Sequence, residues 1–242
     1  MKKLSIIIPV FNEENTIVKV VNNVAGVEIS GVAKEIVVVD DASTDRTAMN
    51  LKSTLISLVN LNKVKFISHK VNQGKGAAVK TGIVNSTGDY IVIQDADLEY
   101  DPKDIVKLVA PIHKNVAKVV YGTRLNRLPN LSHEERRPLF LLHYLGNRFL
   151  SLLTSVLYGQ WITDMETCYK LFPRSAVKDI RLDAKGFEFE PEITAKLLKK
   201  GYSIFEVPIS TNPRGYDEGK KLNTLKDGLI ALWTLLKYRF LD

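Results

Sequence analysis

The sequence contains a single cysteine, Cys168, among its 242 residues. A disulfide within the chain is therefore impossible, and we expect a reducing compartment. The sequence also lacks an uninterrupted apolar run of about 20 residues, which a membrane-spanning helix requires. The two longest apolar stretches, 139–158 and 225–241, are interrupted by polar and charged residues such as Arg148 and Asp227. Neither stretch is predicted to span a bilayer.

Three familiar site motifs are incomplete. Val79 stands where the dinucleotide fingerprint needs its third small residue, and Tyr100 stands where a calcium loop requires glycine. Arg137 replaces the second histidine of the zinc protease helix that His133 and Glu134 would begin. The sequence therefore gives no support to these three kinds of site.

The composition is that of a soluble globular protein with an excess of basic residues. Hydrophobic residues make up 45% of the chain and charged residues 25%, so disorder is not expected. The formal net charge of +7 indicates an anionic partner, which could be a nucleotide, a phospholipid surface or a nucleic acid. Charge alone does not choose among the three.

Short apolar runs alternate with longer segments of helical spacing in the first half of the chain. Near-continuous apolar strands indicate burial on both faces, so the pattern predicts an α/β fold with a mainly parallel sheet between helices. The predicted strands are 4–8, 35–39, 64–68, 90–93 and 116–121, and the predicted helices are 13–24, 45–59, 74–85 and 102–113. The later segments are predicted to form helices at 139–158 and 225–241, a helix within 186–201 that has Pro191 in its first turn and Gly201 at its end, and a strand at 203–209.

Polar segments follow each predicted strand of the first half, and they should meet at one edge of the sheet. Asp95, Asp97 and Glu99 come directly after the strand 90–93. Carboxylates gathered at a strand end repel one another and need a cation, whether a metal ion, an arginine or a lysine. The alternative is a solvated acidic turn before the helix that begins near Pro102. The remaining strand-end segments are 9–13, 40–45, 69–75 and 122–124.

Two further strand-end segments suit a nucleotide or its phosphates. Helix capping accounts for residues 43–45 but not for Asp40 and Asp41, whose carboxylates could accept hydrogen bonds from a base or from ribose hydroxyls. The glycine-rich segment 72–78 could present backbone N–H groups to an anion, or it could be a turn that allows close helix packing.

Charged residues of the second half suggest an acceptor site. Basic side chains make charge-assisted hydrogen bonds to phosphate, although plain solvated surface is the alternative for each of them. Carboxylates there could supply a general base or bind sugar hydroxyls, with helix capping around Pro191 as the alternative. The basic candidates are Arg124, Arg214, Lys220 and Lys221, and the acidic ones are Asp164, Glu166, Glu188, Glu190 and Glu192.

The apolar helices 139–158 and 225–241 allow two interpretations. Such helices usually pack in a core or against another subunit. Basic residues at their flanks favour an interfacial helix on anionic lipid instead. These flanking residues are Arg136, Arg137, Lys237 and Arg239.

Taken together, four motifs resemble the inverting family 2 glycosyltransferases of the GT-A fold. They are Pro9–Glu14, Asp40–Asp45, Asn72–Gly76 and Asp95–Asp97. Within that family, three later segments look like the dolichyl-phosphate mannose synthases and related polyprenyl-phosphate sugar transferases. These are Gly122–Arg124, Phe187–Glu190 and Gly219–Lys221, so the resemblance covers nearly the whole chain.

The resemblance implies a GT-A domain over residues 1–215, with a nucleotide-sugar half at 1–124, an acceptor half at 125–215 and a closing amphipathic helix in 216–242. It also implies a divalent metal, Mg²⁺ or Mn²⁺, on the diphosphate of GDP-mannose or a UDP-hexose. The implied metal ligands are Asp95, Asp97 and Glu99, the last of which departs from the glutamine usual in mannose synthases. The implied donor-binding residues are Pro9, Phe11, Glu13, Asp40, Asp41, Lys75, Asp95 and Ala96.

The resemblance further implies transfer of a hexose to polyprenyl phosphate with inversion. A phosphate acceptor is already anionic at neutral pH and needs no strong base, and Arg124, Arg214, Lys220 and Lys221 would orient it. A glycan hydroxyl acceptor would need a carboxylate base, for which Asp164 is the candidate. Asp97, Arg124 and Asp164 are thus the expected catalytic residues, and a binding protein without turnover is a further alternative. We expect peripheral contact at the cytoplasmic face of a membrane and no nucleic acid partner.

Overall fold

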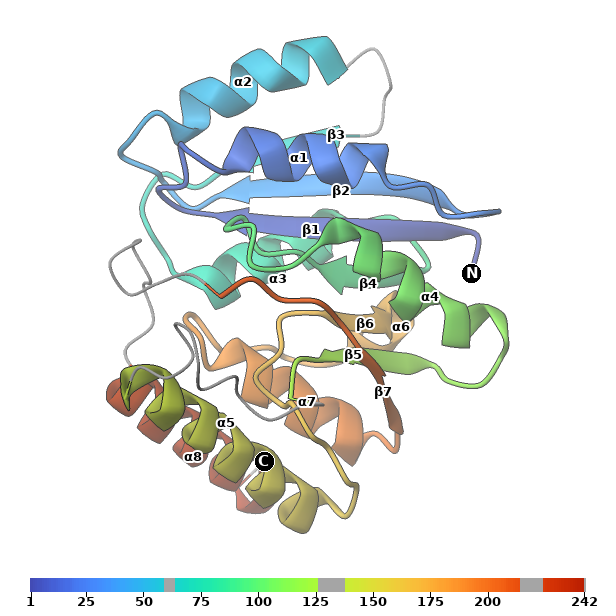
Figure 1. The fold of residues 1–242 in the computed structure, drawn as a ribbon, viewed down its shortest axis with the longest axis vertical. Coiled ribbons are helices and arrows are strands. Elements are labelled where there is room, and N and C mark those ends of the chain that lie inside the picture. The colour runs from blue at the N-terminus through green and yellow to red at the C-terminus, as the bar shows by residue number, and fades with distance from the viewer. Residues whose placement is uncertain (59–63, 126–137, 214–223, 242) are drawn as a thin grey trace.

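The computed structural model describes residues 1–58, 64–125, 138–213 and 224–241 (Figure 1). In these parts of the chain, seven strands form one sheet in the order β3-β2-β1-β4-β6-β5-β7. All neighbouring pairs are parallel except those that β6 makes with β4 and β5. The predicted mainly parallel α/β fold is therefore confirmed. The strands are β1 (Lys3–Val10), β2 (Ala33–Asp40), β3 (Val64–Ser68), β4 (Tyr90–Ile93), β5 (Val119–Thr123), β6 (Lys170–Pro173) and β7 (Ile204–Pro208).

The centre of the sheet brings the predicted strand-end segments to one edge. β1 pairs in parallel with β2 from Lys3↔Ala33 to Val10↔Asp40, and with β4 up to Ile7↔Ile93. The side chains of β1 from Ile6 to Ile8 are fully buried, as expected for a strand covered on both faces. The residues that follow the three strands consequently enter the same region.

Helices cover both faces of the sheet, and a further helical layer lies at one end of the molecule (Figure 1). The buried positions of α1 are Ile17, Val20, Val21 and Val24, and this spacing buries a single face of the helix. Asp101 caps the 3₁₀ turn that leads into α4 by accepting a hydrogen bond from Lys103 N. The helices are α1 (Ile17–Gly26), α2 (Thr47–Leu58), α3 (Lys75–Asn85), η2 (Pro102–Asp104), α4 (Ile105–His113), α5 (Pro138–Tyr158), α6 (Arg174–Val177), α7 (Phe189–Lys199) and α8 (Thr224–Phe240).

Local turns account for the two largest shifts from the predicted boundaries. The helix predicted from residue 13 begins at Ile17, because residues 13–16 form a turn in which Thr16 N donates to Glu13 O. The strand predicted at 116–121 lies at Val119–Thr123, because Val116 N still donates to Pro111 O in the turn that ends α4. β6 is a strand that the hydrophobic pattern did not predict.

The helices α5 and α8 lie side by side at the end of the molecule away from α2 (Figure 1). Tyr158 of α5 donates a hydrogen bond to the carbonyl of Leu235 in α8, and both helices also contact α7. Over the described residues, none of the helices is long and apolar enough to cross a membrane. The proposed division at residue 124 stays a prediction, since strands from both halves share the sheet.

Candidate functional site

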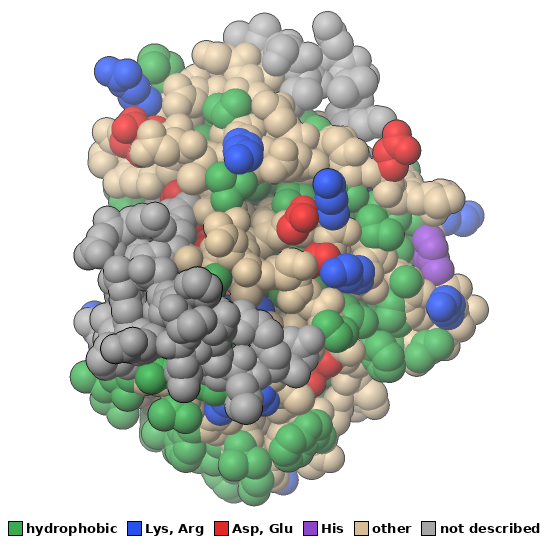
Figure 2. Space-filling model, viewed as in Figure 1, with side chains coloured by type: hydrophobic (Ala, Val, Ile, Leu, Met, Phe, Trp, Pro, Cys, Tyr) green, Lys and Arg blue, Asp and Glu red, His purple; other side chains and the backbone are tan. Residues whose placement is uncertain are grey.

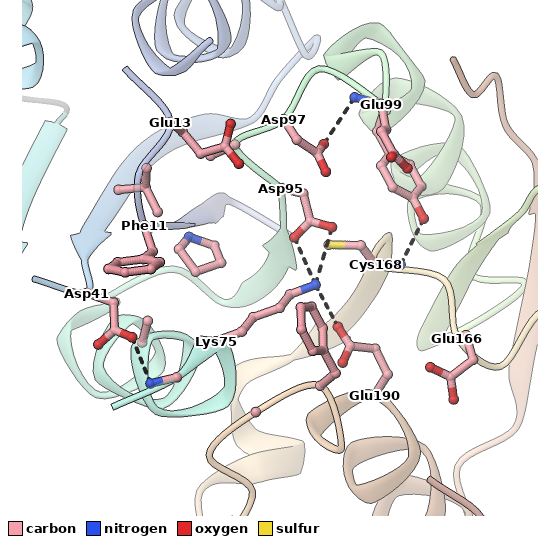
Figure 3. Close-up of a pocket in the computed structure, with 18 of the residues that line it drawn as sticks. Phe11, Glu13, Asp41, Lys75, Asp95, Asp97, Glu99, Glu166, Cys168 and Glu190 are labelled. Atoms are coloured by element: carbon pink, nitrogen blue, oxygen red, sulfur yellow. Dashed lines mark hydrogen bonds and ion pairs between the residues drawn. The ribbon is translucent and has the colours of Figure 1, made fainter. Parts of the chain in front are cut away.

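A cavity of about 400 Å³ opens at the edge of the sheet where β1 and β4 end (Figure 3). It gathers most of the residues that the sequence suggested for the donor and the metal. The predicted residues that line it are Pro9, Phe11, Glu13, Asp41, Lys75, Asp95, Ala96, Asp97, Glu99 and Arg124. Asp40 and Asp164 are buried behind this lining, and Arg214, Lys220 and Lys221 lie outside the described residues.

Asp41 holds the glycine-rich loop at the wall of the cavity. Asp41 is only 2% exposed. Its carboxylate accepts hydrogen bonds from Gly74 N at 2.7 Å and Gln73 N at 3.0 Å and lies 2.7 Å from His69 Nδ1. Asp40 accepts from Ser43 N and from the Ser68 hydroxyl, both at 3.2 Å. Both carboxylates therefore order the loops around the cavity, and Asp41 also contributes to its lining.

Close packing explains the glycines that precede α3. Gly74 has φ of +93°, which side chains rarely adopt, and an added Cβ would lie 2.3 Å from Lys185 O. A Cβ on Gly76 would come within 2.8 Å of Ala184 O. Of the two interpretations of this segment, the structure supports a turn that allows close approach of the 184–186 loop.

Lys75 crosses the cavity and joins two acidic residues that are distant in the sequence. Its Nζ lies 2.9 Å from Asp95 Oδ1 and 2.9 Å from Glu190 Oε1 (Figure 3). Burial alone would lower the pKa of Lys75, but the charges of Asp95 and Glu190 raise it well above its ordinary value. The lysine is thus a permanent cation beside the acidic stretch. Cys168, next to it, is buried, and burial raises the pKa of its thiol, which disfavours a nucleophilic role.

The expected metal ligands only partly come together. Asp95 is paired with Lys75, and Asp97 Oδ1 accepts a hydrogen bond from Glu99 N at 3.1 Å. No group of three histidine, cysteine, aspartate or glutamate side chains suited to a metal occurs in the parts of the chain that the structure describes. Asp95 and Asp97 nevertheless both line the cavity with hard oxygen donors, which fit Mg²⁺ or Mn²⁺ when phosphate oxygens complete the coordination shell.

Arg124 is held at the cavity by a bidentate ion pair with Asp164. Arg124 Nε and Nη2 donate to the two carboxylate oxygens at 2.8 and 2.7 Å, and the backbone N of Arg124 donates at 2.9 Å. Asn147 supplies a fourth hydrogen bond at 3.0 Å to the completely buried Asp164. Burial opposes ionisation of Asp164, yet Arg124 lowers the pKa of this carboxyl below its ordinary value. Asp164 therefore orients Arg124 and is poorly suited to removing a proton from a substrate.

A family model described as glycosyl transferase family 2 matches residues 5–181. The chain belongs to this family. The sequence of this family 2 glycosyltransferase is similar to those of two enzymes whose names include a polyprenyl phosphate. It is 32% identical over 238 residues to the UDP-N-acetylglucosamine–dolichyl-phosphate N-acetylglucosaminyltransferase of Methanococcus voltae, covering 93% of this chain and 91% of the relative. It is 27% identical over 219 residues to the dodecaprenyl-phosphate galacturonate synthase of Rhizobium johnstonii, covering 90% of this chain and 61% of that longer protein.

Solved structures support the GT-A fold expected for a family 2 glycosyltransferase. The glucosyl-3-phosphoglycerate synthase of Mycobacterium tuberculosis with Mn²⁺, UDP and glucosyl-3-phosphoglycerate superposes with a TM-score of 0.72 at 20% identity, covering 100% of this chain and 81% of that chain. Its complex with Mg²⁺ and UDP has a TM-score of 0.69 at 18% identity, covering 100% of this chain and 80% of that chain. At these identities the likeness establishes the fold alone.

Several lining residues of this family 2 glycosyltransferase were not predicted as site residues. Tyr100 follows the acidic stretch, and its ring centroid lies 5.8 Å from Arg124 Cζ. His143 reaches the cavity from α5, where the one signal was a histidine inside an apolar helix. Phe187 arrives just before α7, and only the motif resemblance pointed to it, whereas the neighbouring Glu190 was already among the acidic candidates.

Proposed function

We propose that this family 2 glycosyltransferase moves a sugar from a nucleotide-sugar donor to the phosphate of a polyprenyl phosphate, with Mg²⁺ or Mn²⁺ as cofactor. The observation that carries the proposal is a cation, Arg124, held by Asp164 at a cavity that Asp95 and Asp97 also line. Such a cavity suits a metal-bound diphosphate and an anionic acceptor together. The polyprenyl-phosphate acceptors named for the two relatives support the same acceptor here.

The residues that line the cavity would have separate roles in an inverting transfer. Phe11 and Asp41 would lie along the nucleoside, while Asp95 and Asp97 would hold the metal. A bound divalent cation would neutralise the leaving nucleoside diphosphate as a Lewis acid. Arg124, which Asp164 keeps cationic and oriented against the effect of burial, would position the acceptor phosphate for attack on the anomeric carbon from the face opposite the leaving group. The second pKa of a phosphate monoester is about 6, so this acceptor needs no general base at neutral pH.

The same geometry argues against Asp164 as the base for a glycan hydroxyl acceptor. That reaction needs a general base, and the candidate Asp164 is fully buried with four hydrogen bonds to its carboxylate. Its lowered pKa makes it a weaker base than an ordinary aspartate. The relatives transfer N-acetylglucosamine and galacturonate by name, so mannose is one of several sugars to be tested.

A donor screen tests this proposal. Purified protein would be incubated with polyprenyl phosphate in vesicles, Mn²⁺ or Mg²⁺, and labelled GDP-mannose, UDP-glucose, UDP-N-acetylglucosamine or UDP-galacturonate. We expect label from one donor in an acid-labile lipid product, and none after the metal is removed with EDTA. Donor binding without turnover would contradict the proposal in favour of a binding protein, and unaltered transfer in EDTA would contradict the metal requirement.

We also propose that the outer face of α5 and α8, called here the apolar stripe, rests on the membrane that contains the acceptor. Its residues recur at helical spacing and are 46–73% exposed. Figure 2 shows hydrophobic side chains gathered over this end of the molecule. Lys226 and Arg239 on α8 are also exposed and could contact anionic headgroups. The stripe consists of Leu142, Leu145, Phe149, Leu152 and Val156 of α5 with Leu225, Leu229, Trp233 and Phe240 of α8.

Flotation of the protein with vesicles tests the membrane contact. We expect flotation with vesicles that contain anionic lipid, and loss of flotation in the double variant Leu145→Glu/Trp233→Glu. Val84→Glu is the matched control, because Val84 is 82% exposed on α3, outside the stripe. Absence of flotation in the unaltered protein, or a stripe-dependent dimer in sedimentation, would contradict the membrane assignment.

A further inference from the structure

Two glutamates form one end of the cavity, and the proposed transfer mechanism leaves both without a role. Glu166 precedes β6, and Glu190 stands in the first turn of α7. Glu190 is only 3% exposed, and its Oε1 is paired with Lys75. Its Oε2 and the Oε1 of Glu166 are buried and accept no hydrogen bond from any residue that the structure describes. Buried acceptors of this kind are costly, so a missing hydrogen-bond donor needs an explanation.

The carboxylates of Glu166 and Glu190 interact electrostatically. Burial, together with the charge of Glu190, raises the pKa of Glu166 to about 7, while Lys170 and Arg124 oppose the shift. Lys170 is itself fully buried, and its Nζ donates to the carbonyls of Met165 and Thr167 at 2.6 Å. The lysine fixes the loop that carries Glu166 without hydrogen bonding to its carboxylate.

The position of the pair matches the place of the sugar in a nucleotide-sugar donor. Figure 3 shows Phe11 and Asp41 on one side of Lys75, with Glu166 and Glu190 on the other. A donor whose nucleoside lies along Phe11 and whose diphosphate lies near Asp95 would extend its sugar toward the glutamates. Phe187 also lines this part of the cavity and adds an aromatic face suited to a sugar ring.

Resting on the proposed function, we propose that Glu166 and Glu190 bind the hydroxyl groups of the transferred sugar and select an uncharged hexose over a uronic acid. Sugar hydroxyls donate the hydrogen bonds that Glu166 Oε1 and Glu190 Oε2 lack. A carboxylate on the sugar would instead add a further negative charge to a buried acidic wall, and it would be repelled.

Paired nucleotide sugars provide the test, because the members of each pair differ only at carbon 6. Calorimetry with Mn²⁺ would compare UDP-glucose with UDP-glucuronate and GDP-mannose with GDP-mannuronate, using UDP and GDP as references. We expect the unaltered protein to bind the uncharged member of the accepted pair roughly 10- to 100-fold more tightly. Glu166→Gln and Glu190→Gln should each reduce this preference to about threefold or less, because each removes a negative charge but keeps the shape.

Glu192→Gln separates a specific effect from a structural one. Glu192 also lies on α7 and is fully buried, but its carboxylate already accepts from Asp183 N, Ala184 N and Tyr238 Oη and pairs with Lys196. We expect this variant to be less stable and to keep the sugar preference. Equal binding of both members of the accepted pair, or an unchanged preference in the Glu166→Gln and Glu190→Gln variants, would overturn the sugar site alone. Absence of binding to UDP, GDP and all four donors would overturn the proposed function with it.

Discussion

Replacing Asp164 with asparagine should destabilise the protein strongly, although the substitution preserves the size of the side chain. The Asp164 carboxylate is completely buried and accepts three hydrogen bonds from Arg124 and one from Asn147. Asparagine retains one acceptor oxygen and places an NH₂ group against the N–H donors of Arg124. The substitution therefore leaves a largely buried guanidinium without its counter-charge.

The size of the effect follows from the exposure of the two partners. Removing one member of a buried ion pair typically costs about 3–5 kcal/mol. The Arg124 side chain is 18% exposed, so water can recover part of its solvation and the lower end, about 3 kcal/mol, is expected. For a chain of this size, that loss corresponds to a fall in Tm of roughly 6–12 °C.

Urea unfolding followed by circular dichroism would measure the loss. Asp183→Asn is the matched control, because Asp183 pairs with Arg181 at the surface, where the arginine side chain is 89% exposed. Such surface pairs contribute about 0–1 kcal/mol. Because Arg124 lowers the pKa of Asp164, the stability from this pair is present above the ordinary aspartate pKa and is lost as the pH falls below about 4. An Asp164→Asn protein that loses no more stability than Asp183→Asn would refute a buried, charged pair.

Three further outcomes are expected. Asp97→Ala should abolish transfer with an unchanged circular dichroism spectrum, and normal activity would contradict its place at the metal. Because the pKa of Glu166 is raised to about 7, the contribution of this group to the free energy of unfolding is complete below about pH 4.5 and is lost as the pH rises to 7. Glu166→Gln should therefore reduce the fall in the free energy of unfolding over this pH range by up to about 3 kcal/mol. The same pH dependence in the variant and the unaltered protein would contradict the raised pKa. Gly74→Ala should lower the free energy of unfolding in urea by at least about 2 kcal/mol. Gly31→Ala should lower it less, because Gly31 also has a positive φ but its added Cβ would meet nothing within 4 Å. Equal losses of stability in the two variants would contradict the close contact of Gly74 with Lys185.

The sequence predicted the first half of the chain well because local signals and topology agree there. Parallel strands with continuous apolar runs place their carboxyl ends at one edge, which brought Phe11, Asp41 and Asp95 together as expected. β6 was missed because it has only four residues and includes Lys170. This lysine is buried beneath carbonyl acceptors, with its Nζ 4.3 Å from the centre of the Tyr121 ring.

Contacts between distant segments explain the rest of what the sequence did not predict. The ion pair between Lys75 and Glu190 joins two helices across more than 100 residues, and no local pattern specifies it. Asp164 was considered as a base because its sequence neighbours do not reveal Arg124 as its partner. For α5, the periodicity could not distinguish an inner from an outer apolar face, since the helix has small buried residues such as Ser151 and Thr154 inside and the apolar stripe outside.

The identity of the acceptor atom tests the central claim most directly. A polyprenyl phosphate and the matching polyprenol would be presented in identical vesicles with the accepted labelled donor, and the linkage of the lipid product would be determined by ³¹P and ¹H NMR. We predict transfer to the phosphorylated lipid alone, giving a sugar joined through its anomeric carbon to phosphate with a configuration opposite to that in the donor. Transfer to the free polyprenol, to a glycan hydroxyl only, or with retained configuration would contradict the proposed reaction.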